Sequence, residues 1–165
     1  MCKTVPPSQL PEPGEGKRGE EGHIGYLLRQ AAGAHRLRME RALADLDVTP
    51  PQFSVLTMLA AYPGYSNADL ARLALLTPQT VSVIVLNLER RGAVVRRSHE
   101  VHGRIQHLEL SKSGHALLVK CRSRVHAIEH DLAADLAPSE LKAIRRWLVH
   151  VATGAATTDT RRNRT

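Results

Sequence analysis

The segment 67–92, NADLARLALLTPQTVSVIVLNLERRG, decides the fold because it encodes two helices with a tight turn between them. Ser66 and Asp69 have the spacing of a capping box, which predicts the start of a short helix. Thr77 followed by Pro78 predicts the start of a second helix, since threonine caps helices and proline suits the first helical position. The second helix carries an apolar stripe at three- and four-residue steps, namely Val81, Ile84, Val85 and Leu88. We therefore expect a helix-turn-helix motif.

Two short runs behind this segment predict a β-hairpin. AVVRR at 93–97 and RIQHLEL at 104–110 alternate apolar and polar side chains, the pattern of strands with one buried face. The polar residues 98–103 lie between the runs and predict the turn, while Gly92 ends the preceding helix. A hairpin in this position is the wing of a winged helix-turn-helix.

The stretches on either side are also helical. Apolar residues recur with helical spacing from Gly22 to Leu46 and predict a long first helix. The sequence TPPQ at 49–52 predicts the start of another helix, which YPG at 62–64 ends. Two more helices follow the hairpin, a long one that opens at 111–113 and a last one that begins near 138–140. The expected fold class is mainly α with a small β-wing.

Length and charge restrict the function. A chain of 165 residues holds one domain, or one domain with an added dimerisation element. Lysine and arginine outnumber aspartate and glutamate by 23 to 16, which gives a net charge of +7. This excess predicts attraction to polyanions, nucleic acid first and an anionic membrane surface second. The two cysteines, Cys2 and Cys121, lie far apart and indicate neither a disulfide framework nor a zinc knuckle.

The ends of the chain and its location are also expected from composition. No apolar run approaches 18 residues and the first 20 residues lack the apolar region of a secretory signal, so we expect a cytoplasmic protein with no membrane partner. Residues 1–20 are rich in proline and glycine, and residues 153–165 are small, polar and basic. Both segments are predicted to be disordered tails.

One family matches these residues. NADLARLALLTPQTVSVIVLNLERRGAVVRR followed by HGRIQHLELSKSG resembles the winged helix-turn-helix of the MarR family, the multiple antibiotic resistance regulators. The resemblance extends to TPPQFSVLTML at 49–59 and covers residues 22–152. It implies a DNA-binding domain at 48–111 and a helical dimerisation region at 21–47 and 112–152. Val83 stands where the family commonly has arginine, and His102-Gly103-Arg104 stands where its wing commonly reads D-x-R.

The resemblance implies a sequence-specific regulator, usually a repressor, that binds an inverted-repeat operator in double-stranded DNA as a homodimer. Apolar stripes on the first, fifth and sixth helices exceed what a winged-helix core covers, so the surplus is expected against a second copy, with Trp147 and Leu148 contributing. The competing interpretation is a winged-helix module that binds protein or RNA. Val83 and the altered wing tip keep that alternative open.

Candidate DNA contacts come from the recognition helix and the wing. Glutamine pairs with adenine, threonine and valine suit the thymine methyl group, and arginine suits phosphate. The helix residues are Thr77, Gln79, Thr80, Ser82, Val83, Asn87 and Arg90, and the wing residues are Arg96, Arg97, His102 and Arg104.

A ligand pocket is expected near the DNA-binding lobe. His35 interrupts the apolar stripe of the first helix, and the resemblance implies a small aromatic or phenolic effector bound between helices. The candidate pocket residues are His35, Met39, Phe53 and Met58. The competing interpretation of His35 is an ordinary core residue.

One histidine motif resembles a zinc-binding sequence. HAIEH at 126–130 matches the H-x-x-E-H pattern of inverted zinc peptidases, in which two histidines hold zinc and the glutamate is the base. Only Glu140 remains as a glutamate after His130, so a peptidase site cannot be completed. We expect no enzyme, no catalytic residue, no metal and no cofactor, with a metal-responsive regulator as an alternative.

Overall fold

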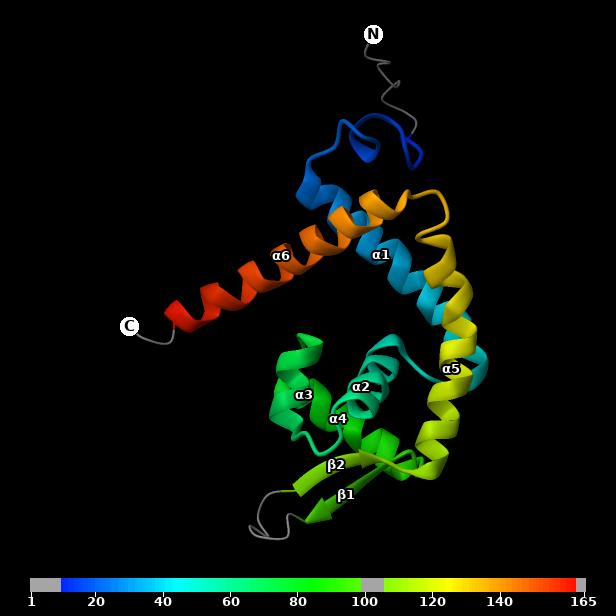
Figure 1. Ribbon diagram of the computed structural model, residues 1–165, viewed down its shortest axis with the longest axis vertical. Coiled ribbons are helices and arrows are strands. Elements are labelled where there is room, and N and C mark those ends of the chain that lie inside the picture. Colours follow the sequence, from blue (N-terminus) through cyan, green and yellow to red (C-terminus); the bar gives the residue numbers. More distant parts are fainter. Residues whose placement is uncertain (1–9, 99–105, 163–165) are drawn as a thin grey trace. The chain divides into compact units, whose positions relative to one another are not determined.

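The computed structural model describes residues 10–98 and 106–162. The chain divides into two compact units, Met1–Val125 and His126–Thr165. In chain order its elements are η1 (Gly16–Arg18), α1 (Ile24–Leu43), η2 (Ala44–Leu46), α2 (Pro50–Ala61), α3 (Asn67–Ala74), α4 (Pro78–Arg90), β1 (Val94–Ser98), β2 (Gln106–Leu110), α5 (Lys112–Asp131) and α6 (Pro138–Arg162). The predicted fold class, mainly helical with a two-stranded wing, is confirmed (Figure 1).

The predicted helix starts are formed by the expected caps. At α2, the hydroxyl of Thr49 accepts from the backbone N–H of Gln52, and the Gln52 side chain accepts from the backbone of Thr49. Ser66 and Asp69 make the same reciprocal pair at α3. Each cap satisfies N–H groups that have no partner inside their own helix.

α3 and α4 form the helix-turn-helix. The turn 75–77 joins them, and the two helices are bent by 112°, within the range of such motifs. Leu75 makes this turn possible by taking a left-handed conformation, with φ of 51°. Thr77 then caps α4 by accepting from the backbone N–H of Thr80 at 3.1 Å.

The core of the first unit lies where α2, α3 and α4 pack on one another and on the wing (Figure 1). Aliphatic side chains fill it, in keeping with an aromatic content of only 3%. The buried cluster is Val55, Leu56, Leu59, Leu70, Ala71, Val81, Ile84, Val85, Leu88, Ala93, Val94, Leu108 and Leu118. Because this cluster takes one face of α4, the opposite face of the helix is left to solvent.

The wing is an antiparallel hairpin with a third segment beside it. The register of β1 and β2 places Val94 opposite Leu110. On the other side of β2, the N–H of Gly64 donates to the carbonyl of Leu108 at 3.0 Å, and the N–H of Leu108 donates to the carbonyl of Tyr65 at 3.3 Å. The loop between α2 and α3 therefore borders the β2 side of the hairpin.

The helix ends differ from the predicted boundaries at three places. α1 ends at Leu43 and continues as the 3₁₀ turn η2, where a single helix to Leu46 was expected. Part of the expected amino-terminal tail is folded back, since the Arg18 side chain donates to the carbonyl of Pro11 at 2.6 Å. α6 extends to Arg162, although a tail was expected from residue 153. A single glycine costs a helix about 1 kcal/mol, too little to end one that runs on into alanines.

The second unit carries α6, which has a row of exposed apolar side chains. Ile144, Trp147, Leu148, Val149 and Val151 are all exposed. Within the described ranges, no single helix is long and apolar enough to cross a bilayer.

Candidate DNA-binding surface

The outer face of α4 is the centre of the candidate site. All seven helix residues predicted to contact DNA are exposed on α4 or at its cap: Thr77, Gln79, Thr80, Ser82, Val83, Asn87 and Arg90. Glu89 is the only acidic residue of this helix, and its carboxylate is bound to Arg96. The exposed face of α4 is thus neutral to basic, which suits a polyanion.

The hydroxyl groups of this face are already engaged. The Ser82 hydroxyl donates to the carbonyl of Pro78 at 2.9 Å and accepts from the Asn67 side-chain amide at 3.3 Å. The hydroxyls of Thr77 and Thr80 are hydrogen-bonded to each other at 2.8 Å. These bonds fix the first turn of α4 and its contact with α3, and they occupy part of the hydrogen-bonding capacity of the hydroxyls.

Both described wing arginines form ion pairs. Arg96 binds Glu89 of α4 through two hydrogen bonds, of 2.7 and 3.1 Å, so it fastens β1 to the recognition helix. Arg97 pairs with Glu109 on the neighbouring strand at 2.7 Å and is the more exposed of the two arginines. Arg96 therefore has a positioning role, and Arg97 lies closer to solvent. His102 and Arg104, the other two predicted wing contacts, lie outside the described residues.

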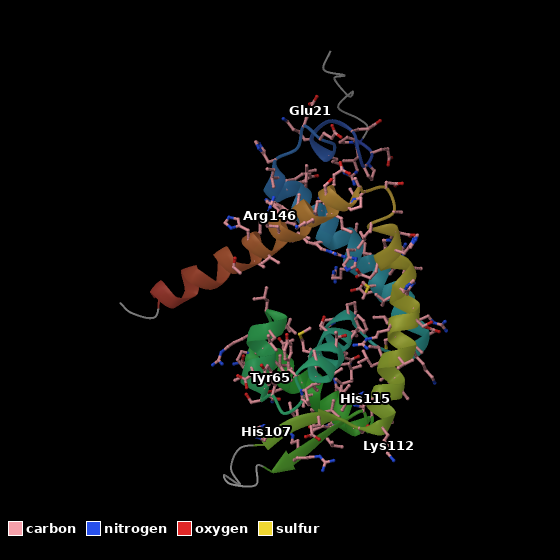
Figure 2. The ribbon with its side chains drawn as sticks, in the orientation of Figure 1. Glu21, Tyr65, His107, Lys112, His115 and Arg146 are labelled. Carbon is pink, nitrogen blue, oxygen red and sulfur yellow. The ribbon has the colours of Figure 1, made fainter. Side chains whose placement is uncertain are left out.

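The wing is fixed to the loop between α2 and α3 by a histidine. The Nδ1 atom of His107 on β2 contacts the carbonyl oxygen of Gly64, next to the Gly64–Leu108 backbone hydrogen bond. Figure 2 labels His107 and Tyr65 in this region, and Tyr65 stacks on Tyr62 with ring centres 5.3 Å apart. The position of the hairpin beside the helix-turn-helix is thereby set by side-chain and backbone contacts together.

The carboxyl end of α4 is tied to the end of η2. The guanidinium of Arg91 donates to the carbonyl oxygens of Leu46 at 2.6 Å and Asp47 at 2.7 Å. Nearby, Asp45 pairs with Arg124 of α5 at 2.6 Å, and the Arg124 guanidinium lowers the pKa of the Asp45 carboxyl. The recognition helix cannot shift without disturbing the segment between α1 and α2.

The four predicted pocket residues do not share one environment. Met39 is buried, and Phe53 and Met58 pack partly buried against the core. His35 is half-buried, and its Nδ1 atom is enclosed without a hydrogen-bond partner in the described part of the chain. The same holds for Thr57 Oγ1 on α2, the helix that contacts α1. His35 thus has a ring nitrogen that is enclosed without a hydrogen-bond partner. An ordinary core histidine would have a partner for this atom.

A shallow surface pocket of about 390 Å³ lies at the junction of the first two helices. Glu40, Ala44, Asp47, Val48, Thr49 and Pro50 line it. None of the four predicted pocket residues does so.

The histidine motif on α5 has both of its histidines, His126 and His130, exposed. Among the described residues, no group of three or more histidine, cysteine, aspartate or glutamate side chains is arranged to hold a metal ion. The single described cysteine, Cys121, is buried, and burial raises the pKa of its thiol.

Sequence reasoning missed three features of the surface. Leu86 is an exposed apolar residue on the outer face of α4 that was not among the predicted DNA contacts. Leu86 lies three residues after Val83, which was predicted to be exposed, and this spacing places both residues on the same face of the helix. Arg72 on α3 is exposed beside Asp69, and Lys112 is exposed at the start of α5 near the wing (Figure 2). Both cations add to the positive charge of the first unit.

The comparisons with known proteins agree on one family. The sequence profile of the MarR family matches residues 46–105. The HTH-type transcriptional repressor Rv2887 of Mycobacterium tuberculosis is 33% identical over 129 residues, which is 78% of this chain and 93% of that protein. A crystal structure of Rv2887 in complex with DNA has a TM-score of 0.63 at 32% identity and covers 78% of this chain and 97% of that one. Rv2887 has also been crystallised with salicylic acid, with a TM-score of 0.64 at 32% identity over 80% of this chain and 98% of that one.

A second regulator extends the likeness to another organism. The PcaV transcriptional regulator of Streptomyces coelicolor, in complex with its natural ligand, has a TM-score of 0.72 at 27% identity and covers 82% of this chain and 95% of that one. The match to Rv2887, at 33% identity, covers nearly the whole length of that protein. The solved structures share the fold of this chain. The chain belongs to the MarR family of transcriptional regulators.

Proposed function

We propose that this protein is a transcriptional repressor that binds an inverted-repeat operator as a homodimer and leaves it when a small aromatic acid binds. The observation that carries the proposal is the division of α4 into a buried aliphatic face and an exposed face with Gln79, Asn87 and Arg90. Such a helix is held rigidly by the core while it presents base-reading amides to the major groove. The DNA complex of Rv2887 supports this role.

The dimer follows from the uncovered helices. α6 exposes a row of apolar side chains that includes Trp147 and Leu148, and α1 exposes Ile24 and Leu37. Exposed apolar rows of this kind are covered in stable proteins by a partner, which for most oligomers is a second copy related by a two-fold axis. Two recognition helices related in this way read two half-sites one DNA turn apart, about 34–36 Å.

The aromatic acid is inferred from relatives and from enclosed polar atoms. Rv2887 has been crystallised with salicylic acid and with p-aminosalicylic acid. In the present chain, His35 Nδ1 and Thr57 Oγ1 are both enclosed without partners on two helices that contact each other. A carboxylate or phenol could satisfy such atoms, and the cost of leaving them unmet is about 1–3 kcal/mol each. The protein is then a cytoplasmic regulator with no catalytic step.

The operator is found by selection from random duplex DNA, followed by footprinting on the enriched sequence. We expect an inverted repeat with half-sites about 10 base pairs apart. Gln79→Ala is expected to weaken operator binding by about 1–3 kcal/mol and to leave binding to random DNA nearly unchanged. Enrichment of no sequence, or preferential retention of RNA, would favour the interaction-module alternative.

The effector is tested with salicylic acid as the probe. Saturating probe is expected to weaken operator binding by about 1–3 kcal/mol, the usual coupling between two sites. His35→Ala is expected to abolish this response while operator affinity without probe is retained. If His35→Ala lowers stability and operator affinity together and the remaining response to the probe is normal, His35 is a core residue.

A further inference from the structure

The centre of the exposed face of α4 is apolar. Val83 is 59% exposed and Leu86 is 44% exposed, and we name these two residues the α4 apolar patch. They are three positions apart and so lie side by side on one face of the helix. Gln79 precedes the patch and Arg90 follows it on the same helix. An apolar pair thus occupies the middle of a surface that is otherwise polar or basic.

Two hydroxyl groups beside the patch are engaged within the protein. The hydroxyls of Ser82 and Thr80 are held by hydrogen bonds to Pro78, Asn67 and Thr77. The methyl group of Thr80 remains, and it adds apolar surface to the same exposed face. The middle of the recognition helix therefore adds apolar surface to the exposed amide groups already described.

A protein partner does not fit this patch. Stable protein interfaces bury about 800 Å² on each partner, far more than two partly exposed side chains supply. The patch also lies on a helix whose single acidic residue is neutralised by Arg96, in a chain of net charge +7. This charge complements a nucleic acid, whose major groove has one exposed apolar group, the C5-methyl of thymine.

We propose that Val83 and Leu86 determine operator specificity by packing against thymine methyl groups in each half-site. This inference rests on the proposed function, and it names what the centre of the recognition helix reads. Removing a contacted methyl is expected to weaken binding about fourfold, because one buried methyl is worth about 0.8 kcal/mol.

The test replaces thymine by uracil, one position at a time, in the operator obtained by selection with the full-length protein. Uracil lacks only the C5-methyl group, so hydrogen bonding and base pairing are unchanged. At one or two positions of each half-site, the wild-type protein is expected to bind the uracil duplex about fourfold more weakly. At the other positions the effect is expected to be less than twofold.

The variant Val83→Ala completes the test. It is expected to bind the thymine and uracil duplexes within twofold of each other at the position that Val83 contacts, because the methyl has lost its partner. The matched control is Val119→Ala on α5, where the valine is 66% exposed and the same two methyls are removed. This control is expected to retain the fourfold discrimination, and circular dichroism checks that both variants fold.

Two failures are distinguishable. If selection enriches no sequence, the proposed function fails and the inference fails with it. If an operator is enriched but the wild-type protein binds every uracil duplex within twofold of the thymine duplex, only the inference is overturned. Discrimination that persists unchanged in Val83→Ala and in Leu86→Ala also overturns it.

Discussion

Leu75 is a residue in an unfavourable backbone conformation at the turn of the helix-turn-helix. Its φ of 51° lies in the left-handed region, which a non-glycine residue adopts at a cost. Its side chain is 71% exposed, so packing contributes little to compensate. The strain is therefore located in the turn that sets the 112° bend between α3 and α4.

Leu75→Gly is expected to raise the free energy of unfolding by about 0.5–1 kcal/mol, because glycine adopts this conformation without steric conflict. The measurement is urea denaturation at neutral pH. The matched control is Leu73→Gly, a 42% exposed leucine within α3, which is expected to lower stability by about 1 kcal/mol. A loss of stability at both positions would contradict the idea of strain at Leu75.

At the scale of elements, the start of α5 packs closely on the start of β1. A Cβ atom added to Gly114 would overlap the carbonyl oxygen of Ala93. The same turn is held by the Ser111 hydroxyl, which accepts from the N–H of Gly114 and donates to the carbonyl of Gly92. Glycine at this position thus lets α5 start directly behind the wing.

Gly114→Ala is expected to lower the free energy of unfolding by roughly 1–3 kcal/mol, since the overlap involves backbone that must shift. Thermal and urea denaturation measure the change. Gly33→Ala in α1 is the control, because its added Cβ meets no described atom within 4 Å and alanine favours helix by up to about 1 kcal/mol. Equal effects from the two substitutions would show that close packing at Gly114 is unimportant.

The ion pair between Asp45 and Arg124 connects η2 to α5 and predicts a pH dependence. The pKa of Asp45 is lowered from its ordinary value of 3.8, first by the hydrogen bond from Arg124. A carboxyl with a lowered pKa in the folded state stabilises the protein above the unfolded-state pKa, and this contribution is lost as pH falls through the folded-state pKa. Both groups are exposed, so the effect is small.

Asp45→Asn is therefore expected to be less stable than the wild type at pH 7 and equally stable at acidic pH below the folded-state pKa. Denaturation at a series of pH values measures the difference. Arg124→Gln removes the same pair from the other side and is expected to give the same loss at neutral pH. A stability difference that is constant over the whole series would mean that the ion pair is not its cause.

The elements were largely predictable because their starts are encoded locally. Thr49, Ser66 and Thr77 each act on residues three positions away, so the caps of α2, α3 and α4 could be recognised without knowledge of the fold. The end of α6 was not recognised, since one glycine is a weak stop signal. Contacts between elements, such as Arg96 with Glu89 or Arg91 with Leu46, depend on tertiary packing and leave no local pattern.

The candidate site was also predictable only in part from the sequence. The exposed polar residues of α4 followed from the position of its apolar stripe. The exposure of Leu86 did not, because an apolar residue in a helix is expected to face the core and only the surrounding structure decides otherwise. For the pocket, the enclosed atoms of His35 and Thr57 appear only when two helices are placed together.

At the scale of the whole molecule, the apolar row on α6 predicts the oligomeric state. Leu148→Glu is expected to raise the dimer dissociation constant by roughly 100-fold or more, because a two-fold interface loses each buried leucine twice. Sedimentation velocity distinguishes the 18.2 kDa chain from its dimer. Lys142→Glu, an exposed position on the same helix, introduces the same side chain with an even larger change in net charge and serves as the control. A wild-type protein that sediments as a monomer at micromolar concentration would exclude the proposed dimer.

The loop that borders β2 also affects how the protein behaves at high concentration. A hairpin with two open edges invites strands of other copies to add to it, which is a common route to aggregation. Here the backbone of Leu108 is already paired with Gly64 and Tyr65, so the β2 edge is closed at that residue. The other strand carries the charged pair Arg96 and Arg97. The wing can therefore extend toward a nucleic acid without acting as a template for fibril growth.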